Sequence, residues 1–185
     1  MNKPVFASDA LHFWFNIVAV SGDNDYRDSG QLLHDGYYST MKTIAVKPMR
    51  CEFASEGLLW IDKIATGVGI IIFNSRNKLA AGIHVLRGIS PGRIPDNPAY
   101  FADTAIEYVL DEFKNKGALN GVSIAIAGGA SMLSSSEKEN VGSNLVAIVK
   151  DILQNKNLSV KLEGVGGTKL RTMILNIDEG KIKIT

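Results

Sequence analysis

The sequence predicts an α/β or α+β layered sandwich, in which mixed β-sheets are flanked by helices. Two segments carry apolar residues at helical spacing, and several short apolar runs have the length and β-branched composition of strands. Because these strands occur both in hairpins and next to helices, we expect mixed sheets. The chain has 185 residues, 45% of them hydrophobic and 21% charged, so it can bury a core without disulfides or metal.

A hairpin of two strands forms the centre of the predicted sheet. Residues 68–73 (Val-Gly-Ile-Ile-Ile-Phe) are continuous, short and β-branched, which is typical of a strand buried on both faces. Residues 74–77 predict a turn and residues 79–85 the returning strand. Further strands are expected at 122–126, 158–162, 172–177 and 181–184, with a hairpin turn at 178–180.

Two amphipathic helices are expected between these strands. The first covers residues 100–116, is ended by Gly117, and buries one stripe: Ala102, Ala105, Ile106, Val109, Leu110 and Phe113. The second begins after a run of serines at 134–136, where Ser134 with Glu137 or Ser136 with Glu139 would form a capping box. Its expected buried stripe is Val141, Leu145, Ile148, Val149 and Ile152.

Charge and cysteine content limit the classes of function. Twenty basic and nineteen acidic residues give a net charge of +1, so neither nucleic-acid binding nor attraction to an anionic membrane is expected. A single cysteine excludes an intrachain disulfide and fits a reducing compartment. The apolar run 10–20 is shorter than the ~20 residues that span a bilayer, and Asp9 and His12 interrupt it. We therefore expect a soluble, cytoplasmic protein without membrane insertion.

No cofactor or metal site is expected from the motifs. The histidines at positions 12 and 34 are too far apart for a local metal motif. The glycine-rich segment 164–167 precedes a strand and matches no phosphate-binding fingerprint, so a tight turn is the better interpretation. Asp103 at a helix start is interpreted as facing the positive end of the helix dipole.

Five segments, in order, resemble the CheD family of chemoreceptor glutamine deamidases. Residues 100–106 (Tyr-Phe-Ala-Asp-Thr-Ala-Ile) look like the family's helix start, and 126–132 (Ile-Ala-Gly-Gly-Ala-Ser-Met) like its glycine turn. Val141-Gly142, the segment 164–167 with Arg171, and the hairpin 178–182 complete the resemblance. It covers about residues 42–184, so we divide the chain into an extension, 1–41, and a CheD-like domain, 42–185.

The resemblance implies both a fold and a reaction. The fold is a layered arrangement of β-sheets flanked by helices, as in the cytotoxic necrotizing factor catalytic domain. The reaction is deamidation of glutamines on the cytoplasmic helices of chemoreceptors. A cysteine thiolate attacks the side-chain amide, a histidine handles protons, ammonia leaves, and water releases glutamate from the thioester.

Two of the three catalytic positions that the resemblance implies carry other residues here. His84 takes the position of the family's histidine. Counting back seventeen residues places Gly67 at the cysteine, and Ala65-Thr66-Gly67-Val68-Gly69 overlays the family's Gly-Ser-Cys-Val-Gly without a gap. Ile61 falls at the family's threonine. Glycine has no side chain to form an acyl intermediate, so we expect an inactive homologue.

Substitutes for the missing nucleophile are weaker candidates. Thr66 carries a hydroxyl, but it leaves the chain in another direction and is a weak nucleophile without a base. Cys51 lies sixteen residues upstream, and a lone cysteine is more often a small buried hydrophobe. His84 itself is either a relic of the site near a partner-binding groove or, as we favour, a hydrogen-bonded structural histidine at a strand end.

Three functions therefore stay open. The first is a silent CheD-like protein that binds chemoreceptor helices or the CheC-type phosphatase that pairs with the family, with Arg87 and Gly88 as departures from the family pattern beside the groove. The second is an active deamidase that uses Cys51. The third is a recruited small-ligand role, which a deep pocket would favour. Phe13, Trp14 and Phe15 in the extension are candidate anchors for covering the groove or for an oligomer interface.

Overall fold

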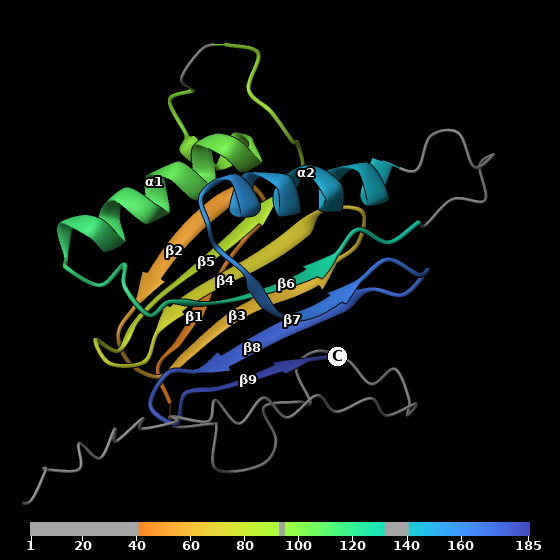
Figure 1. The fold of residues 1–185 in the computed structure, drawn as a ribbon. Helices are drawn as coiled ribbons and strands as arrows, with labels where there is room; N and C mark the ends of the chain where they lie inside the picture. Colours follow the sequence, from red (N-terminus) through yellow and green to blue (C-terminus); the bar gives the residue numbers. More distant parts are fainter. Residues whose placement is uncertain (1–40, 93–94, 132–140) are drawn as a thin grey trace, which may run out of the picture.

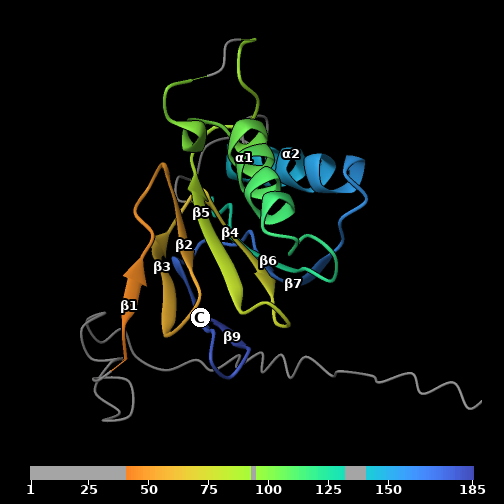
Figure 2. The same ribbon diagram turned by 90° about the vertical axis from the view of Figure 1, so that its left-hand side faces the viewer.

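The computed structural model describes residues 41–92, 95–131 and 141–185, and these residues form three layers (Figure 1). Two helices lie over one face of a five-stranded sheet, and a four-stranded sheet packs against its other face, which Figure 2 shows from the side. The predicted α+β sandwich with mixed sheets is therefore confirmed. The predictions for residues 1–40 and for the capping boxes at 134–139 lie outside the described residues.

Twelve elements follow one another along the described chain. They are β1 (Thr43–Ala45), β2 (Arg50–Ala54), β3 (Leu58–Ile64), β4 (Val68–Asn74), β5 (Leu79–Val85), the short 3-10 helix η1 (Pro98–Tyr100), α1 (Ala102–Asn115), β6 (Ser123–Gly128), α2 (Val141–Asn155), β7 (Val160–Val165), β8 (Arg171–Asn176) and β9 (Lys181–Ile184). The strands predicted from residue 68 onward are all present, with ends shifted by at most three residues. Strands β1, β2 and β3 were not predicted.

Each sheet combines parallel and antiparallel pairs. The larger sheet has the order β2-β5-β4-β6-β7, with β6 and β7 parallel and the other pairs antiparallel. The smaller sheet has the order β1-β3-β8-β9, with only β1 and β3 parallel among these described pairs. Helix α2 makes the crossover between the parallel strands β6 and β7, as parallel pairing requires.

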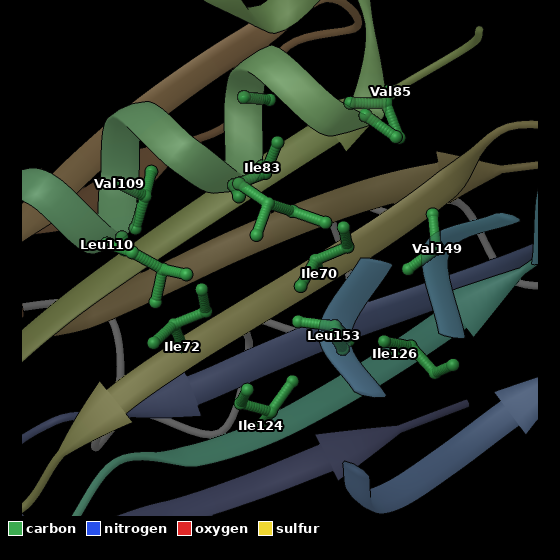
Figure 3. Close-up of a cluster of buried hydrophobic side chains, with 14 of the residues drawn as sticks. Ile70, Ile72, Ile83, Val85, Val109, Leu110, Ile124, Ile126, Val149 and Leu153 are labelled. Carbon is green, nitrogen blue, oxygen red and sulfur yellow. The ribbon is translucent and has the colours of Figure 1, made fainter. Parts of the chain in front are cut away.

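The continuous apolar run of β4 reflects burial on both faces of its sheet. Ile70 and Ile72 point toward the helices and pack with residues of α1 and α2, several of which Figure 3 labels. Ile71 and Phe73 point the other way, into a second core between the two sheets. Because side chains alternate along a strand, a strand in the middle layer needs apolar residues at every position.

Helix α1 confirms its predicted buried stripe. All six residues of that stripe are buried; five of them are at 0% exposure and Leu110 is at 8%. The helix ends where predicted, since Gly117 has a φ of +64°, the left-handed conformation that glycine adopts at low cost. The turn at 74–77 is also present, and the Asn74 side chain accepts hydrogen bonds from the backbone N–H of Arg76 and Asn77.

The predicted stripe of α2 was wrong at Val141, which is 64% exposed. The buried residues are Gly142, Leu145, Val146, Val149 and Leu153, so the buried face is rotated relative to the predicted one. The physical cause is a close approach of two backbones. A Cβ atom added at Gly142 would lie 2.6 Å from the carbonyl carbon of Gly129, so the glycine of the first turn must face the sheet.

Candidate functional site

The candidate site lies at the end of the middle layer where β5 ends and β4 begins. These strands are antiparallel neighbours, and their register pairs His84 with Gly69 and Val85 with Val68. Ile83 and Val85 point toward the helices, so His84 between them points toward the four-stranded sheet. Gly82, two residues earlier, shares this direction, since a Cβ there would meet Val46 and Leu59 of the second core.

Gly67 lies immediately beside the imidazole of His84. A Cβ atom built on Gly67 would be 3.3 Å from Nε2 of His84, 2.8 Å from the carbonyl oxygen of Val85 and 2.6 Å from Cδ2 of Leu86. A side chain at position 67 would therefore start within reach of the histidine. The absence of a Cβ leaves Leu86 and the backbone of β5 packed directly onto residue 67.

Backbone hydrogen bonds hold the loop that carries Gly67. The N–H of Gly129 donates to the carbonyl of Gly67 at 2.8 Å, and the N–H of Ala130 donates to the carbonyl of Ala65 at 2.9 Å. The glycine turn after β6 thus fixes the loop before β4. Thr66 lies in the same loop and its residue is exposed, while Gly67 is buried.

His84 is 3% exposed, and burial lowers the pKa of its imidazole because charging a group away from water is unfavourable. The histidine is therefore neutral at pH 7. Its Nδ1 atom is buried and has no hydrogen-bond partner among the described residues. In a histidine with a purely structural role, a buried ring nitrogen is expected to make a hydrogen bond. The prediction that His84 is a hydrogen-bonded strand-end residue therefore finds no support at Nδ1.

Ile61, which the sequence predicts at the position of the family's threonine, faces the site from the other sheet. It is fully buried on β3, and its Cδ1 atom would lie 3.5 Å from a Cβ built on Gly69, the strand partner of His84. Gly69 is thus the point where the two sheets come close, because Ile64 and Met173 also pack over it. An isoleucine offers this region no hydrogen-bonding group.

Cys51 lies on the opposite side of the five-stranded sheet from His84. It pairs with Ile83 in the register of β2 and β5 and packs, half-buried, against the helix-facing core. Burial, with a smaller contribution from the Glu52 carboxylate, raises the pKa of the thiol to about 12. At neutral pH the thiol is therefore protonated and a poor nucleophile.

Arg87 and Gly88, the predicted partner-binding residues, continue the chain after β5. Arg87 is exposed, and its guanidinium lies 5.9 Å from the centre of the Phe101 ring. Gly88 packs inward, because a Cβ there would lie 2.6 Å from Cδ1 of Ile148 on α2. Its carbonyl also accepts the N–H of Ala102 at 2.8 Å, so Gly88 joins the loop to both helices.

Asp103 fixes the same loop by its side chain. Its two carboxylate oxygens accept the N–H of Ser90 at 3.1 and 3.0 Å, and one of them accepts the N–H of Thr104 at 2.8 Å. Asp103 does lie in the first turn of α1 as predicted, but its loop contact with Ser90 was missed. The sequence holds no signal for that contact, which joins residues thirteen positions apart.

The described part of the chain offers little to other kinds of site. Across residues 41–92, 95–131 and 141–185, no three His, Cys, Asp or Glu side chains are grouped so that they could hold a metal ion. No described helix is long and apolar enough to cross a membrane. One small apolar cavity lies at the other end of β6, near Ile124 and Leu162, with a volume of about 10 Å³. It has room for about one water molecule and does not favour the small-ligand alternative.

Comparisons with known proteins agree with the segments named above. The family profile described as "CheD chemotactic sensory transduction" matches residues 89–185. A protein of Clostridium botulinum (strain Alaska E43 / Type E3), named "Probable chemoreceptor glutamine deamidase CheD", is 34% identical over 143 residues, which cover 71% of this chain and 84% of the relative. A protein of the same name from Clostridium acetobutylicum is 33% identical over 153 residues, covering 76% of this chain and 87% of the relative. The chain therefore belongs to the CheD family of chemotaxis proteins.

Proposed function

We propose that this CheD-family protein binds and regulates a component of the chemotaxis system without deamidating glutamine. One observation carries the proposal. The residue whose side chain would start 3.3 Å from Nε2 of His84 is Gly67, which has no side chain to act as nucleophile. The distance supports the assignment of Gly67 to the cysteine position, an assignment otherwise based on sequence spacing alone.

The chemistry of deamidation explains why this single residue matters. The thiolate forms a bond to the amide carbon, the C–N bond breaks, and the protonated nitrogen leaves as ammonia. Water then cleaves the thioester and releases glutamate and the thiol. Without the sulfur no acyl intermediate forms, and loss of a nucleophile typically lowers the rate by several orders of magnitude. His84 supplies a neutral base but no group to carry the acyl chain.

The alternative, an active deamidase that uses Cys51, is less well supported. The thiol lies on the helix-facing side of the five-stranded sheet, and the imidazole of His84 on the other. The raised pKa of Cys51 is a second argument against this alternative, because the thiolate is the reactive form and little of it is present at neutral pH. Thr66 is exposed next to Gly67, but a threonine hydroxyl needs a base aligned with it.

The proposed partners follow from the family rather than from a contact in the structure. The relatives' name refers to chemoreceptors, and the resemblance adds the CheC-type phosphatase. The chemoreceptor helices that the resemblance implies face the cytoplasm, which is where we place this protein. Arg87 is the better of the two predicted partner-binding residues, because it is exposed, whereas Gly88 packs against α2.

The test is glutamine deamidation of a chemoreceptor cytoplasmic fragment, read by peptide mass spectrometry. The native chain, Cys51→Ala and the double variant Gly67→Cys with Ile61→Thr are compared, and binding of each to the fragment and to a CheC-type phosphatase is measured in parallel. We expect binding without conversion by the native chain, and conversion by the double variant that a further His84→Gln change abolishes. Conversion by the native chain that Cys51→Ala removes would overturn the proposal, as would failure to bind either partner.

A further inference from the structure

The side of the four-stranded sheet that points away from the helices carries two rows of side chains across its strands. Residues within a row are direct partners in the strand register, so their side chains point to the same face. One row is Ala45, Trp60, Ile174 and Lys183, and the other is Thr43, Leu58, Asn176 and Lys181. The alternate row, which faces the core between the sheets, is Ile44, Leu59, Leu175 and Ile182. We call the first two rows the outer face.

The centre of the outer face is more apolar and more buried than a sheet surface in contact with water. A sheet with one face in solvent normally carries polar residues on that face. Here Leu58 is only 2% exposed, although it belongs to neither of the two hydrophobic cores. Trp60 and Ile174 beside it are half-buried. Both described helices pack on the five-stranded sheet, so neither of them provides the cover (Figure 2).

Two buried hydrogen-bond donors on the same face have no acceptor. They are Nε1 of Trp60 and Nδ2 of Asn176, and neither has a partner within the described part of the chain. Asn176 as a whole is 5% exposed. A donor in contact with water is hydrated, whereas a covered donor is expected to find an acceptor in the group that covers it. The covering group must therefore supply acceptors as well as apolar surface.

The part of the chain that precedes the described residues joins the fold at the edge of this face. It leads through Met41 into β1, the edge strand of the four-stranded sheet, and the carbonyl of Lys42 accepts the N–H of Leu58 at 2.8 Å. Strands lie about 4.8 Å apart, so four of them are only about 15 Å across. Residues 21–40 span up to about 65 Å when extended. The apolar run at 10–20 can therefore reach every part of the outer face.

We propose that residues 10–20 of the same chain pack on the outer face and bury Trp60. The run is apolar except for His12 and Asn16, whose side chains can accept the two unpartnered donors. Its tether, residues 21–40, gives it an effective concentration of about millimolar at this face, which favours it over a second copy of the chain.

Charge supports the same occupant. Residues 1–40 contain five aspartates, and their only basic residues are Lys3 and Arg27. The edge of the outer face on β9 carries Lys181 and Lys183, so the two surfaces have opposite charge. This inference does not depend on the proposed function. It assigns the extension to the face away from the helices and leaves the candidate site at the end of β5 open to a partner.

The first experiment uses the two tryptophans of the full chain, Trp14 and Trp60. In Trp14→Phe the indole of Trp60 is the only one, and quenching of its fluorescence by acrylamide measures how far it is covered. The test variant adds Phe13→Asp and Phe15→Asp, which place charges in the apolar run.

The matched control adds Val5→Asp and Phe6→Asp to Trp14→Phe, so the same charges lie in the extension but outside the run. We expect a severalfold higher quenching constant and a red-shifted emission of Trp60 in the test variant, and no change in the control. Slow alkylation of Cys51 in each variant shows that the helix-facing core is intact. Equal quenching of Trp60 in all the variants would overturn the inference, as would an equal rise in the control.

The second experiment needs no charge in the run. Trp14 is replaced by the photoreactive p-benzoylphenylalanine in the full chain, and crosslinked peptides are identified by mass spectrometry after irradiation. Unlabelled and isotope-labelled chains are mixed, so that a bond within one chain is distinguished from a bond between copies. We expect crosslinks from position 14 to β3 or β8 of the same chain.

Two other crosslinking results would contradict the proposal. Crosslinks from position 14 to the loop at residues 86–92 would place the run over the candidate site. Crosslinks between unlabelled and labelled chains would assign the outer face to a second copy of the protein. Neither readout requires deamidase activity, so the packing of the extension can fail while the chain is catalytically silent, and glutamine conversion can appear while the extension still covers Trp60.

Discussion

Cys51 lies directly opposite Ile83 in the antiparallel pair of β2 and β5, and this places its thiol on the helix-facing side of the sheet. His84 follows Ile83 and projects to the other side. The only cysteine of the chain and His84 are therefore separated by the thickness of a β-sheet. No rotation of either side chain brings them together, since side-chain direction is set by the pleat of the strands.

The first prediction concerns the reactivity of that thiol. With a pKa of about 12, Cys51 carries little thiolate at pH 7, and its alkylation rate rises with pH through 10 and beyond. Iodoacetamide labelling followed by intact mass spectrometry between pH 7 and 11 measures this. Free cysteine in the same buffer serves as control. A plateau of the labelling rate near pH 9 would contradict the burial-raised pKa.

The second prediction is a pH dependence of stability from His84. Burial lowers its pKa in the folded state below 6.5, so between the two pKa values the unfolded chain binds more protons than the folded one. The contribution of His84 to the free energy of unfolding is therefore largest above pH 6.5. It falls as the pH drops toward the pKa of His84 in the folded state. Urea denaturation at pH 8, 7, 6 and 5.5 measures the decline, and His84→Gln should make it shallower. An equal slope in both proteins would contradict the assignment.

Much of the middle layer could be predicted from local sequence. The continuous apolar run at residues 68–73 and the six-residue stripe of α1 are strong periodic signals, and both were confirmed. Strand β3 could not be recognised in the same way. Asp62 and Lys63 interrupt its apolar residues, Lys63 has a φ of +53°, and the pairing with β8 shifts register between Ile61 and Ile64. A bulge of this kind breaks the alternation by which strands are found.

The site was predictable only in part, for a related reason. Spacing relative to the family pointed to Gly67 and His84, but their proximity depends on the register of β4 and β5. The packing of Leu86 onto Gly67 left no signal in the sequence, because it joins residues nineteen positions apart across the ends of two strands. Local patterns describe which faces are buried, whereas contacts across strand ends require the folded chain.

The third prediction concerns Asp103 and the loop before α1. Asp103→Ala removes the acceptors of the Ser90 and Thr104 N–H groups, and we expect a loss of about 1–2 kcal/mol in the free energy of unfolding. Amide hydrogen exchange in residues 86–92 should also become faster. Asp111→Ala, an exposed position on the same helix, serves as the matched control. Unchanged exchange at Ser90 in the Asp103 variant would show that the carboxylate does not hold the loop.

The fourth prediction links α2 to the candidate site through Gly142. A Cβ there would lie 2.6 Å from backbone atoms of Gly129, whose N–H donates to the carbonyl of Gly67. Gly142→Ala therefore forces the helix away from the glycine turn, and we expect a loss of about 1–3 kcal/mol, the usual cost of overpacking a closed contact. Part of that loss is offset by the higher helix propensity of alanine.

The control for Gly142→Ala is Asn144→Ala, an exposed position in the first turns of the same helix that gains helix propensity without a steric contact. We expect it to be neutral or slightly stabilising in urea denaturation. Hydrogen exchange at the Gly129 amide should become faster in Gly142→Ala and not in Asn144→Ala. The reason is that movement of the glycine turn strains the hydrogen bond from the Gly129 N–H to the Gly67 carbonyl. If Gly142→Ala is as stable as the native chain and protects that amide equally, the close packing of α2 on the turn does not position the loop that carries Gly67.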